Sequence, residues 1–346
     1  MTRLRRWLRP ASVVGLALAL AGCASDAPQD AMKPEGPLAR KIDELFDPVF
    51  LVAVVVFFFV QGLIVFAIIK FRRKPGDESF PEQIHGNTRL ELGWTILPAL
   101  ILGAIGVFTV PVIFDLSEST PNALEVEVVG QKYWWSYTYE PQARYGISQP
   151  IVTANELHIP AGVDVRLTLR SEDVIHSFWA PKLNGKRDVV PGRIHDWRLS
   201  ADHAGVYSGQ CAEFCGVSHA NMRLKVVSHD EAGWAEWVDQ LETSPLEPTS
   251  GLAAEGHELF SQKGCAGCHT VAGQYDEVAD DSPAAPDLSH LFSRDCFAGC
   301  IYDLNDRTEV EAWLRDPQRK AGSLMRIGQL TEAEIDRLYA YLRTLE

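Results

Sequence analysis

Positive charge and sulfur are both scarce in this chain of 346 residues. Its 32 Lys and Arg are outnumbered by 46 Asp and Glu, which leaves a formal net charge of −14 at pH 7. This acidic balance argues against nucleic acid as a partner, because phosphate would be repelled. The chain holds only seven Cys and four Met. Because the sulfur atoms are so few, a role can be considered for each of them individually.

The charge pattern at the start of the chain is typical of an export signal. Four arginines lie within the first nine residues, an apolar run too short to span a bilayer follows over residues 11–20, and Leu20-Ala21-Gly22-Cys23 has the small residues of a cleavage site. Leu-Ala-Gly-Cys also resembles the bacterial lipobox, after which Cys23 would be the lipidated first residue. An ordinary signal peptide is the alternative. Either signal places the mature N-terminus outside the cytoplasm.

Charged residues are absent from two longer apolar stretches, about residues 48–69 and 92–114. Each stretch is long enough to cross a bilayer as a helix. The segment between them carries five basic residues, which the positive-inside rule places in the cytoplasm: Lys70, Arg72, Arg73, Lys74 and Arg89. Everything from about residue 116 onward is then exported. Neither stretch contains a histidine, so the hairpin has no imidazole ligand for haem or copper.

The region from Leu124 to about Val227 consists of short β-rich runs broken by Pro and Gly. Residues 124–129 and 163–169 alternate between apolar and polar side chains, as half-buried strands do. Roughly a hundred residues of this kind predict an antiparallel sandwich or barrel. The aromatic run Tyr133–Tyr139 is expected to be one of its strands.

A cluster of soft metal ligands lies within residues 211–222. Thiolate, imidazole and thioether groups together favour copper. The cluster contains two thiols, a carboxylate, an imidazole and a thioether: Cys211, Cys215, Glu213, His219 and Met222. Flanking glycines favour a loop over a helix face, and a further ligand should come from elsewhere, with His176 as the candidate. A disulfide or a zinc site is the alternative for the two thiols.

The segment Cys265-Ala-Gly-Cys268-His269 has the attachment pattern of a c-type haem, in which two thiols bind the porphyrin and the histidine binds iron. A redox-active dithiol is the alternative. Met325 is the only methionine after this motif and is the candidate sixth ligand, with His290 as the second choice. The remaining pair, Cys296 and Cys300, is expected to form a local disulfide in an exported domain.

The residues from about 41 to 230 resemble subunit II of the haem-copper cytochrome c oxidases. The resemblance rests on the 211–222 cluster together with the segments Asp173–Trp179 and Asp188–Arg193. It implies a cupredoxin-type barrel that holds the dinuclear copper centre CuA. The thiolates of Cys211 and Cys215 would bridge the coppers and His176 and His219 would cap them. Weak outer ligands would be Met222 and the carbonyl of Glu213, whose side chain would also bind magnesium at the interface with subunit I.

Two further roles follow from this resemblance. Glu91, near the start of the second membrane helix, would open a proton-uptake channel of subunit I. Trp134, in the aromatic run, is a candidate electron relay. The run commonly begins with Gln-Trp in the family, whereas Lys132-Tyr133 stands here. This departure suggests that electron entry has moved to the haem.

The C-terminal residues resemble a small class I cytochrome c, as found fused to subunit II in caa3-type oxidases. Those usually have Met-Pro, whereas Arg326 follows Met325 here. We therefore expect a multidomain membrane protein with a two-helix transmembrane hairpin, an all-β cupredoxin-like barrel and an all-α cytochrome c domain. The expected segments are a lipoprotein signal peptide (1–22), an N-terminal tether (23–40), the hairpin (41–115), the CuA domain (120–230), a helix and linker (231–250) and the cytochrome c domain (251–346).

The resemblance implies an electron-input subunit in a bacterial plasma membrane, with its copper and haem domains on the periplasmic side. Electrons would pass from haem c to CuA and on to haem in subunit I, where O2 reduction and proton pumping occur. Expected partners are subunit I with its haem and CuB, subunit III, a cytochrome c or other periplasmic donor, and membrane lipid. A membrane-tethered copper delivery or storage protein is the alternative, because two Cys-x3-Cys pairs occur. A quinol oxidase subunit II would lack the copper ligands.

Overall fold

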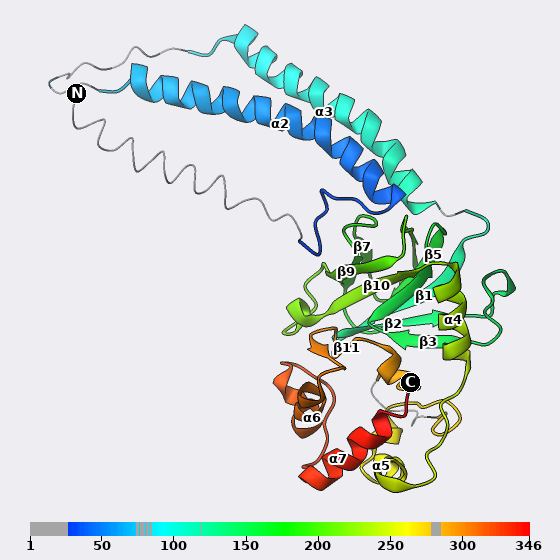
Figure 1. Cartoon of the computed structure of the whole chain (residues 1–346). Helices are drawn as coiled ribbons and strands as arrows, with labels where there is room; N and C mark the ends of the chain where they lie inside the picture. Colours follow the sequence, from blue (N-terminus) through cyan, green and yellow to red (C-terminus); the bar gives the residue numbers. More distant parts are fainter. Residues whose placement is uncertain are drawn as a thin grey trace, which may run out of the picture.

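The computed structural model describes residues 27–73, 76, 80, 83, 85–118, 120–277 and 285–346. The expected signal peptide and Cys23 lie outside these residues. Figure 1 shows three parts in a row: a pair of long helices, a β domain, and a helical domain on the side of the β domain away from the helix pair. This architecture confirms the predicted fold class.

Two helices form the hairpin, α2 over Pro37–Lys70 and α3 over Thr88–Ser117. Both are long and apolar enough to cross a membrane, and most of their large apolar side chains are exposed, as suits contact with lipid. Helix α2 begins well before residue 48, where the apolar run starts. The reason is packing, because Leu38 is buried in the core of the β domain and Arg40 pairs with Asp202 there.

In the described part of the chain, the β domain has two five-stranded sheets with the orders β3-β2-β1-β5-β8 and β4-β10-β9-β6-β7. Inward side chains from both sheets share one apolar core, which makes the domain a cupredoxin-like barrel. The strands are β1 Leu124–Gln131, β2 Trp134–Tyr139, β3 Ile151–Ala154, β4 Glu156–Pro160, β5 Val165–Ser171, β6 His176–Trp179, β7 Arg187–Val189, β8 His195–Leu199, β9 Gly205–Cys211 and β10 Arg223–His229. Short 3-10 turns occur at η1 Ala143–Tyr145 and η2 His219–Asn221.

The expectation of a purely antiparallel barrel is wrong for two strand pairs. Strand β1 runs parallel to β5, and β4 runs parallel to β10. Parallel neighbours need a long connection between them, and both pairs have one. The alternating pattern predicts which side chains face the core, but it does not predict which distant strand becomes the neighbour.

Helix α4 over Glu231–Glu242 covers one side of the barrel (Figure 1). Asp230 caps it, which confirms the helix expected here. Its Trp237 packs edge-on against Tyr139 of β2, with ring centroids 5.2 Å apart. The chain then passes through residues 243–250 into the helical domain.

The helical domain is built around the crossing of its first and last helices. Its elements are α5 Gly251–Gln262, η3 Cys265–Gly267, η4 Leu291–Ser293, β11 Cys296–Phe297, β12 Tyr302–Asp303, α6 Arg307–Arg315, η5 Pro317–Arg319 and α7 Glu332–Leu342. A Cβ at Gly256 of α5 would lie 2.0 Å from the carbonyl oxygen of Arg337 in α7, so the close crossing requires glycine. Thr331 caps α7 in a reciprocal capping box with Glu334.

Candidate copper and haem sites

Three soft ligands meet inside the barrel because strands β6 and β9 pair with each other. His176 begins β6 and Cys211 ends β9. Cys211 Sγ lies 3.9 Å from His176 Nδ1 and 4.0 Å from Cys215 Sγ. All three residues are buried, and their donor atoms lie within 4.8 Å of one another. Two thiols and an imidazole at these separations fit a copper site.

The loop after β9 brings the remaining expected ligands to the same place. Cys215 Sγ lies 3.7 Å from His219 Nδ1 and 3.8 Å from Met222 Sδ. Cys211 Sγ lies 3.2 Å from the carbonyl oxygen of Glu213. The segment is a loop that ends in the short turn η2, as expected, and the structure brings all six predicted copper ligands together.

Asp173 supports this cluster, and sequence reasoning did not assign it a role. Its Oδ1 lies 2.8 Å from His176 Nε2, and its Oδ2 accepts a hydrogen bond from the backbone N–H of Lys132. A carboxylate on one imidazole nitrogen orients the other nitrogen toward the metal and makes it a stronger ligand. The signal was present in the sequence, because Asp173 is three residues before His176.

The pKa values of the two thiols, Cys211 and Cys215, are shifted in opposite directions. The pKa of Cys211 is lowered to about 4, first by a hydrogen bond from the Cys215 thiol and also by His176, while burial opposes this shift. The pKa of Cys215 is raised, because it donates to Cys211 and because it is buried. Burial favours neutral His176, but hydrogen bonding to Cys211 and Asp173 raises its pKa overall. A thiolate, the form that binds metal, is therefore favoured at Cys211.

A cavity of about 480 Å³ lies between the helical domain and the barrel. It is lined by the four residues expected to hold haem: Cys265, Cys268, His269 and Met325. Burial lowers the pKa of His269, and its Nδ1 lies 2.7 Å from the carbonyl oxygen of Pro286. With Nδ1–H donated to that oxygen, Nε2 keeps its lone pair for iron.

The two candidates for the sixth haem ligand lie in different surroundings. Met325 lines the cavity, and its Sδ accepts a hydrogen bond from Trp313 Nε1 at 3.2 Å. His290 is not among the lining residues, and its Nδ1 lies 3.0 Å from the backbone oxygen of Glu346. The geometry therefore favours the sulfur of Met325 over His290.

A buried guanidinium gives an independent test of whether haem suits this cavity. Arg294 lines the cavity and is only 5% exposed. Its Nη2 donates to the carbonyl oxygen of Asp287, but its Nε has no partner among the described residues. A buried donor of this kind calls for an anionic acceptor, and haem carries carboxylates. The donor set and the orphaned nitrogen both fit haem.

The copper and haem sites share a wall. Lys132, Tyr133 and Trp134 of the barrel line the haem cavity. At the other end, a Cβ at Gly216 would lie 2.4 Å from Tyr133 Oη, so the hydroxyl of Tyr133 rests against the residue that follows Cys215.

The other predicted residues lie as follows. Trp134 is half-buried at the start of β2. Glu91 lies in the first turn of α3, which Asn87 caps; Figure 1 shows that α3 starts at the end of the hairpin away from the barrel. Cys296 and Cys300 form a disulfide, as predicted.

Three known families match three successive segments of the chain. Residues 28–112 match the family "Cytochrome C oxidase subunit II, transmembrane domain", residues 124–229 match "Cytochrome C oxidase subunit II, periplasmic domain", and residues 253–346 match "Cytochrome c".

Individual relatives extend over nearly the whole chain. Cytochrome c oxidase subunit 2 of Alkalihalophilus pseudofirmus is 35% identical over 96% of this chain and 95% of its own length. The subunit 2 of Bacillus subtilis is 32% identical over 95% of each. A crystal structure of the periplasmic domain of subunit II from Bradyrhizobium japonicum matches at 26% identity and a TM-score of 0.33, covering 36% of this chain and 97% of that one. This chain, an oxidoreductase subunit, therefore belongs to the cytochrome c oxidase subunit II family and carries a fused C-terminal cytochrome c domain.

Proposed function

We propose that this chain is the electron-input subunit of a respiratory haem-copper oxidase. When bound, haem c and the dinuclear CuA centre would supply one-electron carriers, so that electrons pass from haem c to CuA and on to haem in subunit I, where O2 reduction and proton pumping take place. The residues of this chain would hold both carriers, exclude water from them and fix their separation.

At the haem site, Cys265 and Cys268 would form the two thioether bonds to the porphyrin. His269 Nε2 and Met325 Sδ would be the two protein ligands of the haem iron. The hydrogen bond from Trp313 Nε1 to Met325 Sδ restricts where that sulfur can point. A methionine ligand in place of a second histidine favours a higher reduction potential.

At the copper site, two thiolates, two imidazoles, a thioether and a backbone carbonyl would hold the dinuclear centre. They belong to Cys211, Cys215, His176, His219, Met222 and Glu213. The first and last residues of paired strands and the loop between β9 and β10 supply these donors. Strand pairing and burial limit their movement, so little geometry needs to change when an electron arrives.

The main support for this proposal is the wall that the copper and haem sites share. Tyr133 lines the haem cavity with its neighbour Trp134, and its hydroxyl rests against Gly216 beside Cys215. Tyr133 thus lies between the haem cavity and the copper loop. Such contiguous packing supports transfer within the chain, with Trp134 as a candidate relay.

Family membership supports the partners and further sites. Subunit I, with its haem and CuB, is the implied partner, and subunit III and a cytochrome c or other periplasmic donor would complete the system. Glu91 would open a proton-uptake channel into subunit I. The carboxylate of Glu213 would bind magnesium shared with subunit I.

The same reasoning gives the location. The two apolar helices suit a plasma membrane, and the basic residues Lys70, Arg72 and Arg73 at the hairpin turn favour the cytoplasm for that turn. The barrel and haem domain would then lie on the periplasmic side, with Cys23 lipidated.

Metal analysis and optical spectra of the purified full chain test this proposal. We expect twice as much copper as haem iron, with a near-infrared mixed-valence band. Cys211→Ser should remove the copper and that band while leaving the haem spectrum intact. One labile Cu(I) without such a band would support copper delivery instead. The disulfide between Cys296 and Cys300 removes two of the thiols on which the delivery alternative depends.

A further inference from the structure

One carboxylate of the barrel is buried where the barrel meets the haem domain. Glu156, the first residue of β4, is 2% exposed. Its Oε1 accepts hydrogen bonds from the backbone N–H groups of Asp295, at 3.0 Å, and Cys296, at 3.1 Å. Both donors belong to the haem domain. A buried carboxylate is costly unless it is paired and hydrogen-bonded, so this contact depends on both domains being in place.

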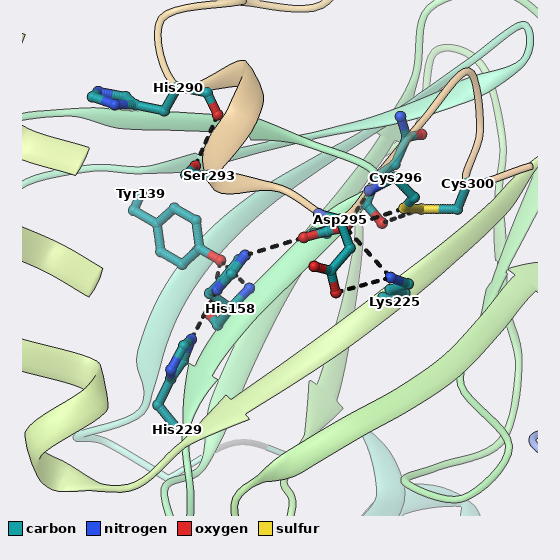
Figure 2. A network of polar contacts seen from close by, with 11 residues as sticks. Tyr139, His158, Lys225, His229, His290, Ser293, Asp295, Cys296 and Cys300 are labelled. Atoms are coloured by element: carbon teal, nitrogen blue, oxygen red, sulfur yellow. Dashed lines mark hydrogen bonds and ion pairs between the residues drawn. A yellow bond between two sulfur atoms is a disulfide. The ribbon is translucent and has the colours of Figure 1, made fainter. Parts of the chain in front are cut away.

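Charged groups reinforce the contact across the same boundary. Lys225 of β10 lies 3.7 Å from Glu156 Oε1 and 3.2 Å from Asp295 Oδ2 (Figure 2). Within the barrel, His158 Nε2 lies 3.8 Å from Glu156 Oε2, and because burial lowers the pKa of His158 well below its ordinary value, this contact is with a neutral imidazole. Figure 2 shows Asp295, Cys296 and Cys300 gathered beside Lys225.

The haem domain presents these amides on a short loop, residues 295–300, which we call the docking loop. The disulfide between Cys296 and Cys300 closes it. Three successive residues, Ala298, Gly299 and Cys300, have φ values of 52°, 79° and 53°. This left-handed run is unusual for residues other than glycine and turns the loop back on itself.

One carbonyl group of the docking loop binds the barrel directly, and a second is connected to it through Lys320 of the haem domain. Gly299 O accepts a hydrogen bond from the backbone N–H of Arg223 at 3.1 Å. Lys320 Nζ, from a side chain buried in the interface, donates to Ala298 O at 2.7 Å and to Tyr133 O at 2.9 Å. These bonds connect the loop directly to the wall of the haem cavity.

The approach is close enough to exclude a side chain. A Cβ at Gly299 would lie 2.4 Å from the carbonyl oxygen of Asn221 and 2.9 Å from that of Tyr133. Real Cβ atoms do not come this near to backbone oxygen, so docking at this distance requires glycine.

We propose that Glu156 and the docking loop form a latch that holds the haem domain on the copper barrel in one fixed position. Glu156 is a positioning residue, because it acts through the docking loop and is not among the residues expected to hold either carrier. The consequence for electron transfer rests on the proposed function. The latch itself is a contact between two protein surfaces. With it closed, residues 243–250 connect two docked domains instead of tethering a mobile one.

Zero-length cross-linking with a carbodiimide tests the latch without reference to metals. In the full chain, Lys225 and Asp295 should be joined, because they form an ion pair across the boundary. The pair Lys263 and Glu334, 2.6 Å apart within the haem domain, is the internal reference. In Glu156→Ala the equilibrium constant for docking should fall at least about tenfold, as expected for losing two hydrogen bonds, and the yield of the interdomain link relative to this reference should fall with it. The loss of Glu156 also removes a competing carboxylate from Lys225, which would by itself raise the yield.

Matched variants separate the latch from general destabilisation. Glu127→Ala removes a carboxylate that pairs with Arg170 within the barrel and should leave the interdomain link unchanged. Gly299→Ala should break the link without changing charge. Its control is Gly251→Ala in the same domain, where φ is also positive, at 72°, but where a Cβ has no described atom within 4 Å. Glu156→Gln keeps one acceptor oxygen and should retain more of the link than Glu156→Ala.

The functional readout is the rate of electron transfer from haem to copper within the loaded chain. Glu156→Ala and Gly299→Ala should slow it at least about tenfold with both optical spectra unchanged, if the link yield falls by the same factor. An undiminished link in both variants would overturn the latch, and a lost link with an unchanged rate would overturn its positioning role. If the parent chain transfers no electron between the two carriers, the proposed function fails while the cross-link still decides the latch.

Discussion

Removal of the Cys296–Cys300 disulfide should make the docking loop open more often. The size of this effect depends on the length of the loop and on its backbone conformation. The cysteines are four residues apart, and a cross-link over so short a loop contributes about 2 kcal/mol by restricting the open state. Against this, the left-handed conformation costs about 1–2 kcal/mol at each of Ala298 and Cys300, which are not glycine. The two effects are similar in size, so the loop depends on the disulfide to keep its shape.

The double variant Cys296→Ser/Cys300→Ser should therefore lower the free energy of loop opening by about 2 kcal/mol. That change corresponds to a roughly 30-fold larger open population, because each 1.4 kcal/mol is about a factor of ten. Glycine adopts positive φ without a steric penalty. Cys296→Ser/Cys300→Gly should consequently recover about 1 kcal/mol of the loss.

Hydrogen exchange measured by mass spectrometry gives this opening free energy directly. The relevant amides are those of Asp295 and Cys296, which donate hydrogen bonds to Glu156. Their exchange should speed up roughly 30-fold in the serine pair and less in the Ser/Gly pair, while peptides from β1 exchange as in the parent. Equal exchange in all three proteins, or faster exchange in the Ser/Gly pair than in the serine pair, would refute the reasoning.

Four other predictions concern supporting residues. Asp173→Asn should weaken copper binding roughly 10- to 100-fold, because His176 loses the carboxylate that orients it; competition titration with a chelator measures this, and unchanged affinity would contradict the assigned role. Gly256→Ala should destabilise the haem domain by about 1–3 kcal/mol in guanidinium unfolding, since the added methyl meets backbone of the partner helix. Thr331→Ala should lower the free energy of unfolding of the haem domain by about 1 kcal/mol, because α7 loses its cap. The pKa of Glu334 is lowered to about 2, first by its contact with Lys263 and then by a hydrogen bond from the backbone amide of Thr331. The stability that the ionised Glu334 contributes should therefore be complete above the ordinary pKa of glutamate and be lost as pH falls toward 2. If the stability of Glu334→Gln changes with pH over that range in the same way as the stability of the parent, the role assigned to Glu334 is wrong.

The candidate sites could be proposed from the sequence because most of their residues lie close together in it. Cys211, Cys215, His219 and Met222 lie within twelve residues, and the haem attachment motif spans five. Several soft donors within one short segment are typical of a metal site. The disulfide between Cys296 and Cys300 follows from the same short spacing.

Features that join distant segments were not predictable in this way. The parallel pairing of β1 with β5 depends on the whole path of the chain, and alternation of side chains contains no information about it. Glu156 has the sequence appearance of an ordinary strand residue, and only docking of a segment some 140 residues later makes it a buried acceptor. Lys320 is likewise an unremarkable cation until two domains enclose it.

The proposed function requires that electrons pass between two carriers held by this one chain. Rapid photochemical reduction of haem in the purified full chain, with absorbance of both centres followed in time, measures this transfer. We expect haem reoxidation and copper reduction to proceed together, with a rate constant that does not depend on protein concentration. Copper reduction that becomes faster in proportion to protein concentration, or a haem that stays reduced beside oxidised copper, would contradict it.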